Sequence, residues 1–116
     1  IFFVPQIVPM NRGILMTVYT DIDPKINTDT LNEIYKKYYQ KSPFVYISSI
    51  SPNTSDVRGT NCCNIKIIVD ERTGKLLIIS VLDNLLKGQS GNAVQNANIR
   101  LGFEQSCGLK LNPIYP

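Results

Sequence analysis

The chain has 116 residues, of which 43% are hydrophobic and 18% charged, and its formal net charge is +3. This composition fits a single globular domain and excludes a disordered or fibrous protein. The charge is too small, and its lysines and arginines too scattered, to favour a nucleic-acid partner, and no apolar run reaches the ~18 residues of a membrane span.

Two stretches of β-rich sequence come first. Residues 2–8 are expected to be extended, with Pro5 placing them at a sheet edge or irregularity. After a turn at 10–13, β-branched and apolar residues predict a strand over 14–22. The chain starts on this strand-like run without an initiator Met or a signal peptide, so we expect it to be part of a longer protein.

The next stretch predicts a helix that ends at Ser42-Pro43. Thr30 and Glu33 have the spacing of a capping box, and Asn27 or Thr28 is an alternative cap. Apolar residues at helical spacing define its inner face: Leu31, Ile34, Tyr35 and Tyr38.

Three further strands are predicted, over 44–48, 60–69 and 75–82, with a polar loop at 50–57. The last two should form a hairpin, because the short polar connection between them ends in Gly74. Residues 83–91 are predicted to be a loop and residues 92–101 a second helix. Because most strands follow one another without a helical crossover, the fold class is α+β, a mainly antiparallel sheet with both helices covering one face.

Cysteines stand at 62, 63 and 107, and histidine is absent. Adjacent cysteines on a strand point to opposite faces, so they neither bridge readily nor share a metal ion. We expect reduced thiols, no metal site and a cytoplasmic protein, or an organellar one in a eukaryote. Catalysis by either paired cysteine is disfavoured, because the usual activating base is missing.

The stretch 87–92, KGQSGN, lies between a buried strand and a helix. A helix amino end leaves N–H groups unpaired, glycines allow close approach, and Lys87 adds a charge, so the segment suits an anionic ligand. Alternatively, Gly88 and Gly91 serve turn geometry and Ser90 caps the helix. The amides that follow suit either a ligand or a solvated face: Asn92, Gln95, Asn96 and Asn98.

Two more arginines stand in glycine-containing turns. Arg12 can clamp a phosphate or carboxylate, or it can form an ordinary surface ion pair. Arg58 opens the stretch 58–64, which is either a binding loop or a bulge with core thiols.

Four segments together resemble the carboxy-terminal part of the N-acetyl-γ-glutamyl-phosphate reductases. They are VPMNRGI at 8–14, VRGTNCCNI at 57–65, DNLLKGQSGNAVQN at 83–96 and GLKLNPIYP at 108–116. The resemblance covers essentially the whole chain. It implies a domain like the C-terminal domain of glyceraldehyde-3-phosphate dehydrogenase. The Rossmann domain, with its GxGxxG fingerprint, is absent from this chain.

The resemblance also implies a function. Such an enzyme uses NADPH to reduce N-acetyl-L-glutamyl 5-phosphate to the 5-semialdehyde in arginine biosynthesis. The catalytic Cys and His are expected upstream, so this chain supplies no catalytic residue and is expected to be inactive alone. Arg12 would contact substrate, and the sheet would join copies into a homo-oligomer. The cofactor-binding residues would be Asn84, Lys87, Gly88 and Asn92.

Two positions depart from the family pattern: Gln6 stands where His is common, and Cys62 where an aromatic residue is common. Two alternatives remain. The substrate is an aspartyl or aminoadipyl phosphate, or the chain is a non-catalytic dimerisation module.

Overall fold

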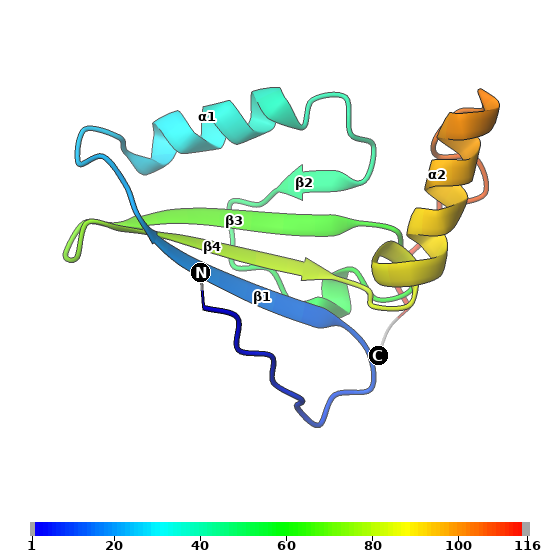
Figure 1. Ribbon diagram of the computed structural model, residues 1–116, viewed down its shortest axis with the longest axis horizontal. Helices are drawn as coiled ribbons and strands as arrows, with labels where there is room; N and C mark the ends of the chain where they lie inside the picture. Colours follow the sequence, from blue (N-terminus) through cyan, green and yellow to red (C-terminus); the bar gives the residue numbers. More distant parts are fainter. Residues whose placement is uncertain (1, 115–116) are drawn as a thin grey trace.

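The computed structural model describes residues 2–114, which form a sheet with one helix along it and a second helix at its end (Figure 1). Residues 1 and 115–116, including the end of the segment 108–116 noted above, lie outside the described residues. Within 2–114, no helix has the length and apolar character needed to cross a membrane.

The sheet has four strands in the order β1-β4-β3-β2. Their bounds are β1 Ile14–Asp21, β2 Val45–Ile47, β3 Cys63–Asp70 and β4 Lys75–Leu82. β4 pairs antiparallel with both β1 and β3, whereas β2 runs parallel to β3. The α+β class and the mainly antiparallel sheet are therefore confirmed. The parallel pair arises because the long connection at 48–62 returns the chain to the end of the sheet where β2 begins, so that β3 starts beside the start of β2.

The predicted hairpin is confirmed as the pair β3–β4, which closes at Asp70 and Lys75. Gly74 has a φ of 65°, in the left-handed region that this turn requires. The Asp70 carboxylate accepts hydrogen bonds from the Thr73 hydroxyl and the Arg72 N–H. Local sequence alone specifies this turn.

Residues 2–8 form no strand, which corrects the expectation for this segment. Its large apolar side chains, including Phe2, Phe3 and Ile7, are exposed. Pro5 and Pro9 lack backbone N–H donors, so the segment cannot supply a full row of sheet hydrogen bonds.

Helix α1 (Thr28–Tyr38) begins at Asn27, whose side-chain oxygen accepts from the Thr30 N–H at 2.9 Å. The alternative cap is therefore correct and the Thr30–Glu33 capping box is wrong. A capping box does occur elsewhere, between Asn53 and Asp56, where a 3₁₀ turn (η1, Thr54–Asp56) interrupts the predicted polar loop.

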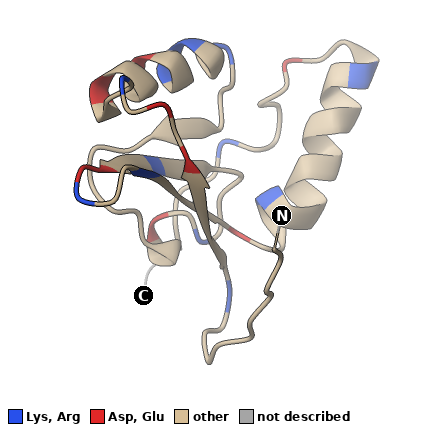
Figure 2. Ribbon diagram, turned by 60° about the vertical axis from the view of Figure 1, so that its left-hand side comes forward, with Lys and Arg blue, Asp and Glu red and all other residues tan. Residues whose placement is uncertain are grey.

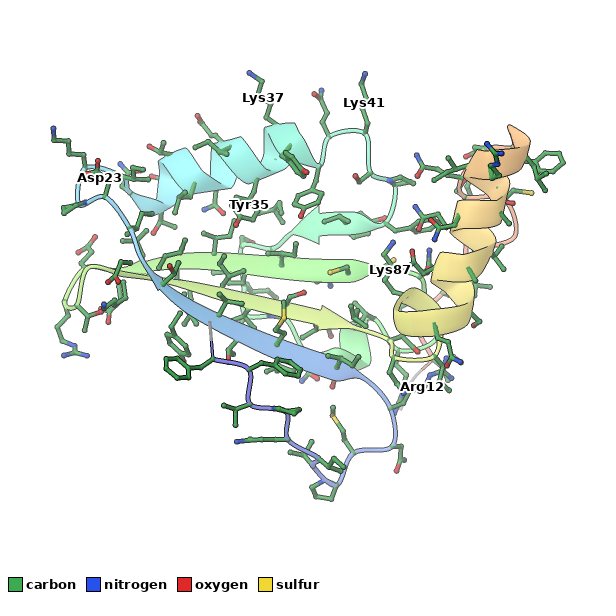
Figure 3. The ribbon with its side chains drawn as sticks, in the orientation of Figure 1. Arg12, Asp23, Tyr35, Lys37, Lys41 and Lys87 are labelled. Atoms are coloured by element: carbon green, nitrogen blue, oxygen red, sulfur yellow. The ribbon has the colours of Figure 1, made fainter. Side chains whose placement is uncertain are left out.

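α1 packs Leu31 into a cluster with Ile65, Ile67 and Leu76 of the sheet, and Tyr35 lies against this core. Figure 3 shows Tyr35 pointing from α1 towards the strands. Two residues assigned to the inner face by spacing, Ile34 and Tyr38, are exposed instead. The side chains that pack against the core are thus the buried Leu31 and the partly buried Tyr35, together with Tyr39 at the C-cap.

Helix α2 (Gly91–Leu101) stands at the end of the strands and not on a sheet face (Figure 1). The expectation that both helices cover one face holds only for α1. As a result, the end of the sheet nearest β4's carboxyl terminus becomes a junction between β1, β4, the loop before β3 and α2.

Candidate functional site

The predicted loop at 83–91 is helical over its second half. A π-helical segment, η2 (Leu86–Ser90), runs directly into α2. The N–H groups of Ser90 and Gly91 bond to the carbonyls of Leu85 and Leu86. No open helix end therefore exists at Gly91, and the argument for an anion site from unpaired N–H groups there is wrong. Ser90 is not a cap either: its hydroxyl donates to the Leu85 carbonyl at 2.6 Å.

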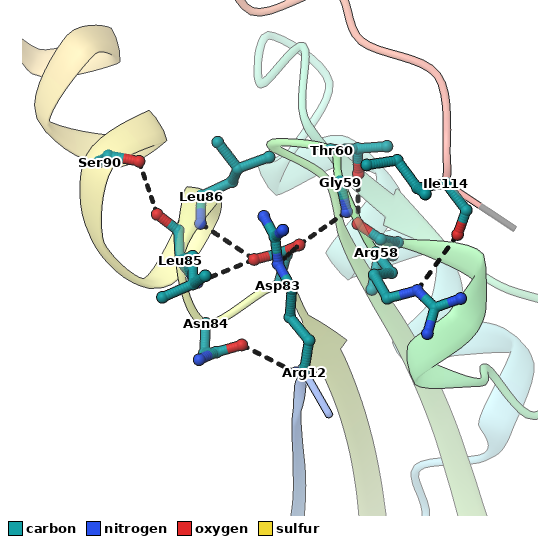
Figure 4. A network of polar contacts seen from close by, with 12 residues as sticks. Arg12, Arg58, Gly59, Thr60, Asp83, Asn84, Leu85, Leu86, Ser90 and Ile114 are labelled. Carbon is teal, nitrogen blue, oxygen red and sulfur yellow. Dashed lines mark hydrogen bonds and ion pairs between the residues drawn. The ribbon is translucent and has the colours of Figure 1, made fainter. Parts of the chain in front are cut away.

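The Asp83 side chain accepts hydrogen bonds from the backbone N–H groups at the start of this helical segment. One carboxylate oxygen accepts from the N–H groups of Leu85 at 2.8 Å and Leu86 at 3.0 Å, as in an Asx turn. The other accepts from the Gly59 N–H at 2.6 Å and lies 2.7 Å from Arg12 Nε. Figure 4 shows these contacts converging on a carboxylate that is completely buried.

The surroundings of Asp83 keep it ionised. Burial alone would raise the pKa of its carboxyl, because desolvation disfavours the charged form. The hydrogen bond from Gly59, the Arg12 guanidinium and the N–H groups of Leu86 and Leu85 outweigh burial, and the pKa lies below its usual value. The buried site thus contains a carboxylate anion matched by a cation and three donors.

Arg12 is fixed at the entrance to β1. Its Nε forms an ion pair with Asp83, although the angle is too poor for a well-formed hydrogen bond. The Gly13 N–H donates to the Asn84 side-chain oxygen at 2.8 Å, which ties the turn at Arg12 to the chain after β4. Among the contacts within residues 2–114, the ion pair with Asp83 engages Nε, and neither terminal guanidinium nitrogen has a hydrogen bond or ion pair, so these two nitrogens are the groups available to a ligand.

Lys87 also lies at this end of the sheet, beside α2 (Figure 3). Its ammonium donates to Gln95 Oε1 at 2.8 Å and is 5.9 Å from the centre of the Phe44 ring. Desolvation lowers the pKa of Lys87, an effect that the neighbouring thiols of Cys63 and Cys62 partly oppose. Within residues 2–114, no carboxylate forms an ion pair with it.

The two glycines of the segment play different parts. A Cβ on Gly91 would be 2.5 Å from the side-chain oxygen of Asn61, a clash. A Cβ on Gly88 would meet its nearest atom, the Asp83 carbonyl oxygen, at 3.4 Å, an ordinary contact. Neither residue has a positive φ. Gly91 is therefore required by internal packing against Asn61.

α2 turns polar residues inward. Gly91, Gln95 and Asn98 are buried, whereas Asn92 and Asn96 are exposed. The large apolar residues of α2, which a helical pattern would place inward, are exposed instead, including Val94 and Leu101. The i, i+4, i+7 spacing of Gly91, Gln95 and Asn98 was the available signal, but a rule that buries apolar residues cannot detect it.

The stretch 58–64 is built into the fold. Arg58 Nε donates to the Ile114 carbonyl at 3.2 Å, which anchors the C-terminal segment. Cys63 contacts the Ser80 hydroxyl at 3.3 Å, and all three cysteines are free thiols. These contacts favour a structural part for the stretch. It is a turn before β3 and not a bulge, because β3 pairs regularly with β4 from Cys63 onward, and the thiols of Cys62 and Cys63 are half-buried.

Charge is distributed and not collected into one patch. In Figure 2 the Lys and Arg residues occur on α1, on the sheet, on the β3–β4 turn, in η2, at the end of α2 and in loops. The positive charges of Arg12 and Lys87 at the end of the sheet are therefore not part of a larger basic patch, and their environment is set by the contacts described above.

The profile of the semialdehyde dehydrogenase dimerisation domain matches residues 1–84, most of the chain. The chain belongs to this family. Similar curated proteins are each named N-acetyl-gamma-glutamyl-phosphate reductase. One from Pelobacter propionicus is 46% identical over 98% of this chain, and those of Staphylococcus aureus MRSA252 and Geobacter sp. M21 are 46% and 44% identical over 118 aligned residues. The chain spans about a third of their length, 34% in the first two.

The Asp83 contacts give a prediction for stability. Asp83→Asn should lower the free energy of unfolding by about 3 kcal/mol, because it leaves Arg12 without its buried partner. The folded-state pKa lies below the ordinary value of 3.8, so the contribution of the charge is present above that pH and is lost as the pH falls towards the folded-state value.

Urea unfolding of wild type and variant measures this difference at neutral pH and below pH 3.8. Asp21→Asn is the matched control, because Asp21 pairs with Lys75 on the exposed surface and should contribute little. Equal destabilisation by the two variants, or a difference that does not shrink in acid, would contradict the assignment.

Proposed function

We propose that this chain is part of an NADP-dependent reductase that converts N-acetyl-L-glutamyl 5-phosphate to N-acetyl-L-glutamate 5-semialdehyde in arginine biosynthesis. The observation that carries the proposal is the similarity at 44–46% identity, along essentially the whole chain, to proteins named N-acetyl-gamma-glutamyl-phosphate reductase. The activity is a property of the complete protein. In this proposal its nucleophilic Cys, its His and a Rossmann domain precede the segment described above.

Lys87 is the cofactor-facing residue of this proposal, with Asn84, Gly88 and Asn92 beside it. The site fits an anionic cofactor because, within residues 2–114, the acceptor of the Lys87 ammonium is a neutral amide, and because the ammonium is partly desolvated, which strengthens its attraction to a phosphate. The Asn84 oxygen is occupied by Gly13, which leaves its NH₂ group as a donor. NADPH, when bound, supplies the hydride. These residues would hold and orient the cofactor.

Arg12 is the proposed substrate contact. Asp83 holds its Nε from within the protein, so the guanidinium is already oriented before a ligand arrives. A planar fork with two free terminal nitrogens suits a phosphate or carboxylate group. Preorganisation of this kind lowers the entropic cost of binding.

The sheet is the proposed contact between copies. Strand alternation places Leu15 and Tyr19, with Leu77 and Ile79, on the face opposite α1. Leu15 is 53% exposed and Tyr19 71% exposed in the chain by itself. An apolar sheet face of this kind fits the dimerisation role in the family's name. The free thiols support a reducing compartment, and we propose the cytoplasm.

The cofactor role predicts the effect of Lys87→Ala in the complete protein. Loss of one charge-assisted hydrogen bond should raise the KM for NADPH about tenfold. Asn92→Ala should raise it less. Steady-state oxidation of NADPH measures both, with Lys36→Ala on the exposed side of α1 as control. An unchanged KM in both site variants would refute the cofactor role.

The oligomer role predicts that Tyr19→Glu weakens self-association of the complete protein, because it puts a charge into an apolar contact. Sedimentation velocity measures the shift from oligomer to monomer. Tyr38→Glu makes the same change at a side chain that is 79% exposed on α1 and should leave the oligomer intact. If neither variant dissociates it, the proposed interface is wrong.

A further inference from the structure

The Lys87 ammonium lies at the end of a chain of side-chain amides. Gln95 Oε1 accepts from Lys87 Nζ at 2.8 Å and also from Asn61 Nδ2 at 3.0 Å. Asn61 is completely buried and Gln95 nearly so, with 9% of its surface exposed. One neutral oxygen therefore receives two donors in a place that water hardly reaches.

The orientation of the Gln95 amide is set from its other side. Gln95 Nε2 donates to Gln105 Oε1 at 3.0 Å, and Gln105 Nε2 lies 3.5 Å from the Lys41 carbonyl, to which it donates. Rotating the Gln95 amide by half a turn would place its NH₂ group against the ammonium and its oxygen against another oxygen. The network thus fixes the oxygen towards Lys87.

The backbone of α2 secures the same arrangement. The Asn61 side-chain oxygen, which has no hydrogen-bond partner among the described residues, lies 2.5 Å from where a Cβ of residue 91 would be, so only glycine lets α2 approach Asn61 this closely. Asn98 Nδ2 donates to the Cys107 carbonyl at 2.9 Å and holds the C-terminal segment that carries Gln105. The buried side of α2 is polar because it holds this amide network.

We propose that Gln95 is a positioning residue that directs the Lys87 ammonium towards an anionic ligand, and that a neutral amide is required there because it orients the lysine without cancelling its charge. The inference rests on the proposed function of Lys87. It adds to that function the residue that orients the lysine side chain. Glu has the same shape as Gln, but it would form a buried ion pair with Lys87 and compete with the phosphate of the ligand.

The test uses the complete protein with Gln95→Glu, Gln95→Met and, as a control for the change in charge, Gln40→Glu at an exposed position in the turn after α1. One readout is the pKa of Lys87, measured by NMR of ¹³C-methylated lysines and assigned with Lys87→Arg. The other is the pair of constants KM for NADPH and kcat.

Gln95→Glu should raise the pKa of Lys87 by about one pH unit or more. It should also raise the KM for NADPH about tenfold with kcat changed less than about twofold. Gln95→Met, which removes the acceptor, should lower the pKa of Lys87 and also raise the KM. Gln40→Glu should alter neither quantity.

The outcomes separate the two proposals. If Lys87→Ala raises the KM but Gln95→Glu leaves both the KM and the pKa of Lys87 unchanged, the positioning role is overturned and the cofactor role stands. If Gln95→Glu shifts the pKa of Lys87 while Lys87→Ala leaves the KM unchanged, Gln95 holds the lysine, but the cofactor role and the ligand-directing part of the inference are wrong.

Discussion

A single buried carboxylate organises the candidate site. Asp83 follows β4 directly, and its two oxygens contact the loop before β3, the start of the helical segment and the guanidinium of Arg12. A buried carboxylate costs several kcal/mol in desolvation unless such partners surround it. Removing any one partner leaves part of that cost unmatched, so the four segments are held together as a unit.

This constraint determines which groups are left for a ligand. The Asp83 carboxylate accepts from the N–H groups of Leu85 and Leu86. The N–H groups of Gly88, Ser90 and Gly91 are bonded to the backbone carbonyls of Asp83, Leu85 and Leu86. In the proposed function, recognition of an anion therefore falls to side chains: the terminal nitrogens of Arg12 and the ammonium of Lys87. Each is held from behind, Arg12 by a charge and Lys87 by a neutral amide. The ion pair with Asp83 fixes the orientation of the Arg12 guanidinium. The neutral Gln95 amide orients Lys87 and leaves the charge of its ammonium uncancelled.

The parts of the fold that local sequence specifies were predictable. The β3–β4 hairpin depends on Gly74 and on the apolar runs on either side of the turn. The start of α1 depends on Asn27, whose side chain accepts from the N–H of Thr30 three residues later. Residues 2–8 were mispredicted because their composition resembles a strand, while their prolines and exposure do not support one.

The site was predictable only in part. Sequence motifs identified Arg12 and Lys87 as candidates, but not what holds them. Gly59 lies 24 residues from Asp83 along the chain, and Gln95 lies 34 residues from Asn61. No periodicity relates such positions. The apolar pattern of α2 does not predict which side of the helix is buried, because the buried side is the polar one.

The site depends on the Asp83 carboxyl being a charged, hydrogen-bonded anion in the folded chain. Its pKa can be measured directly by following the side-chain carboxyl carbon of Asp83 by ¹³C NMR as the pH is lowered, with Asp83→Asn used for assignment. A pKa below 3.8 is the predicted result. A pKa above that value would mean that burial outweighs the contacts from Gly59, Arg12 and the helix, and would contradict the account.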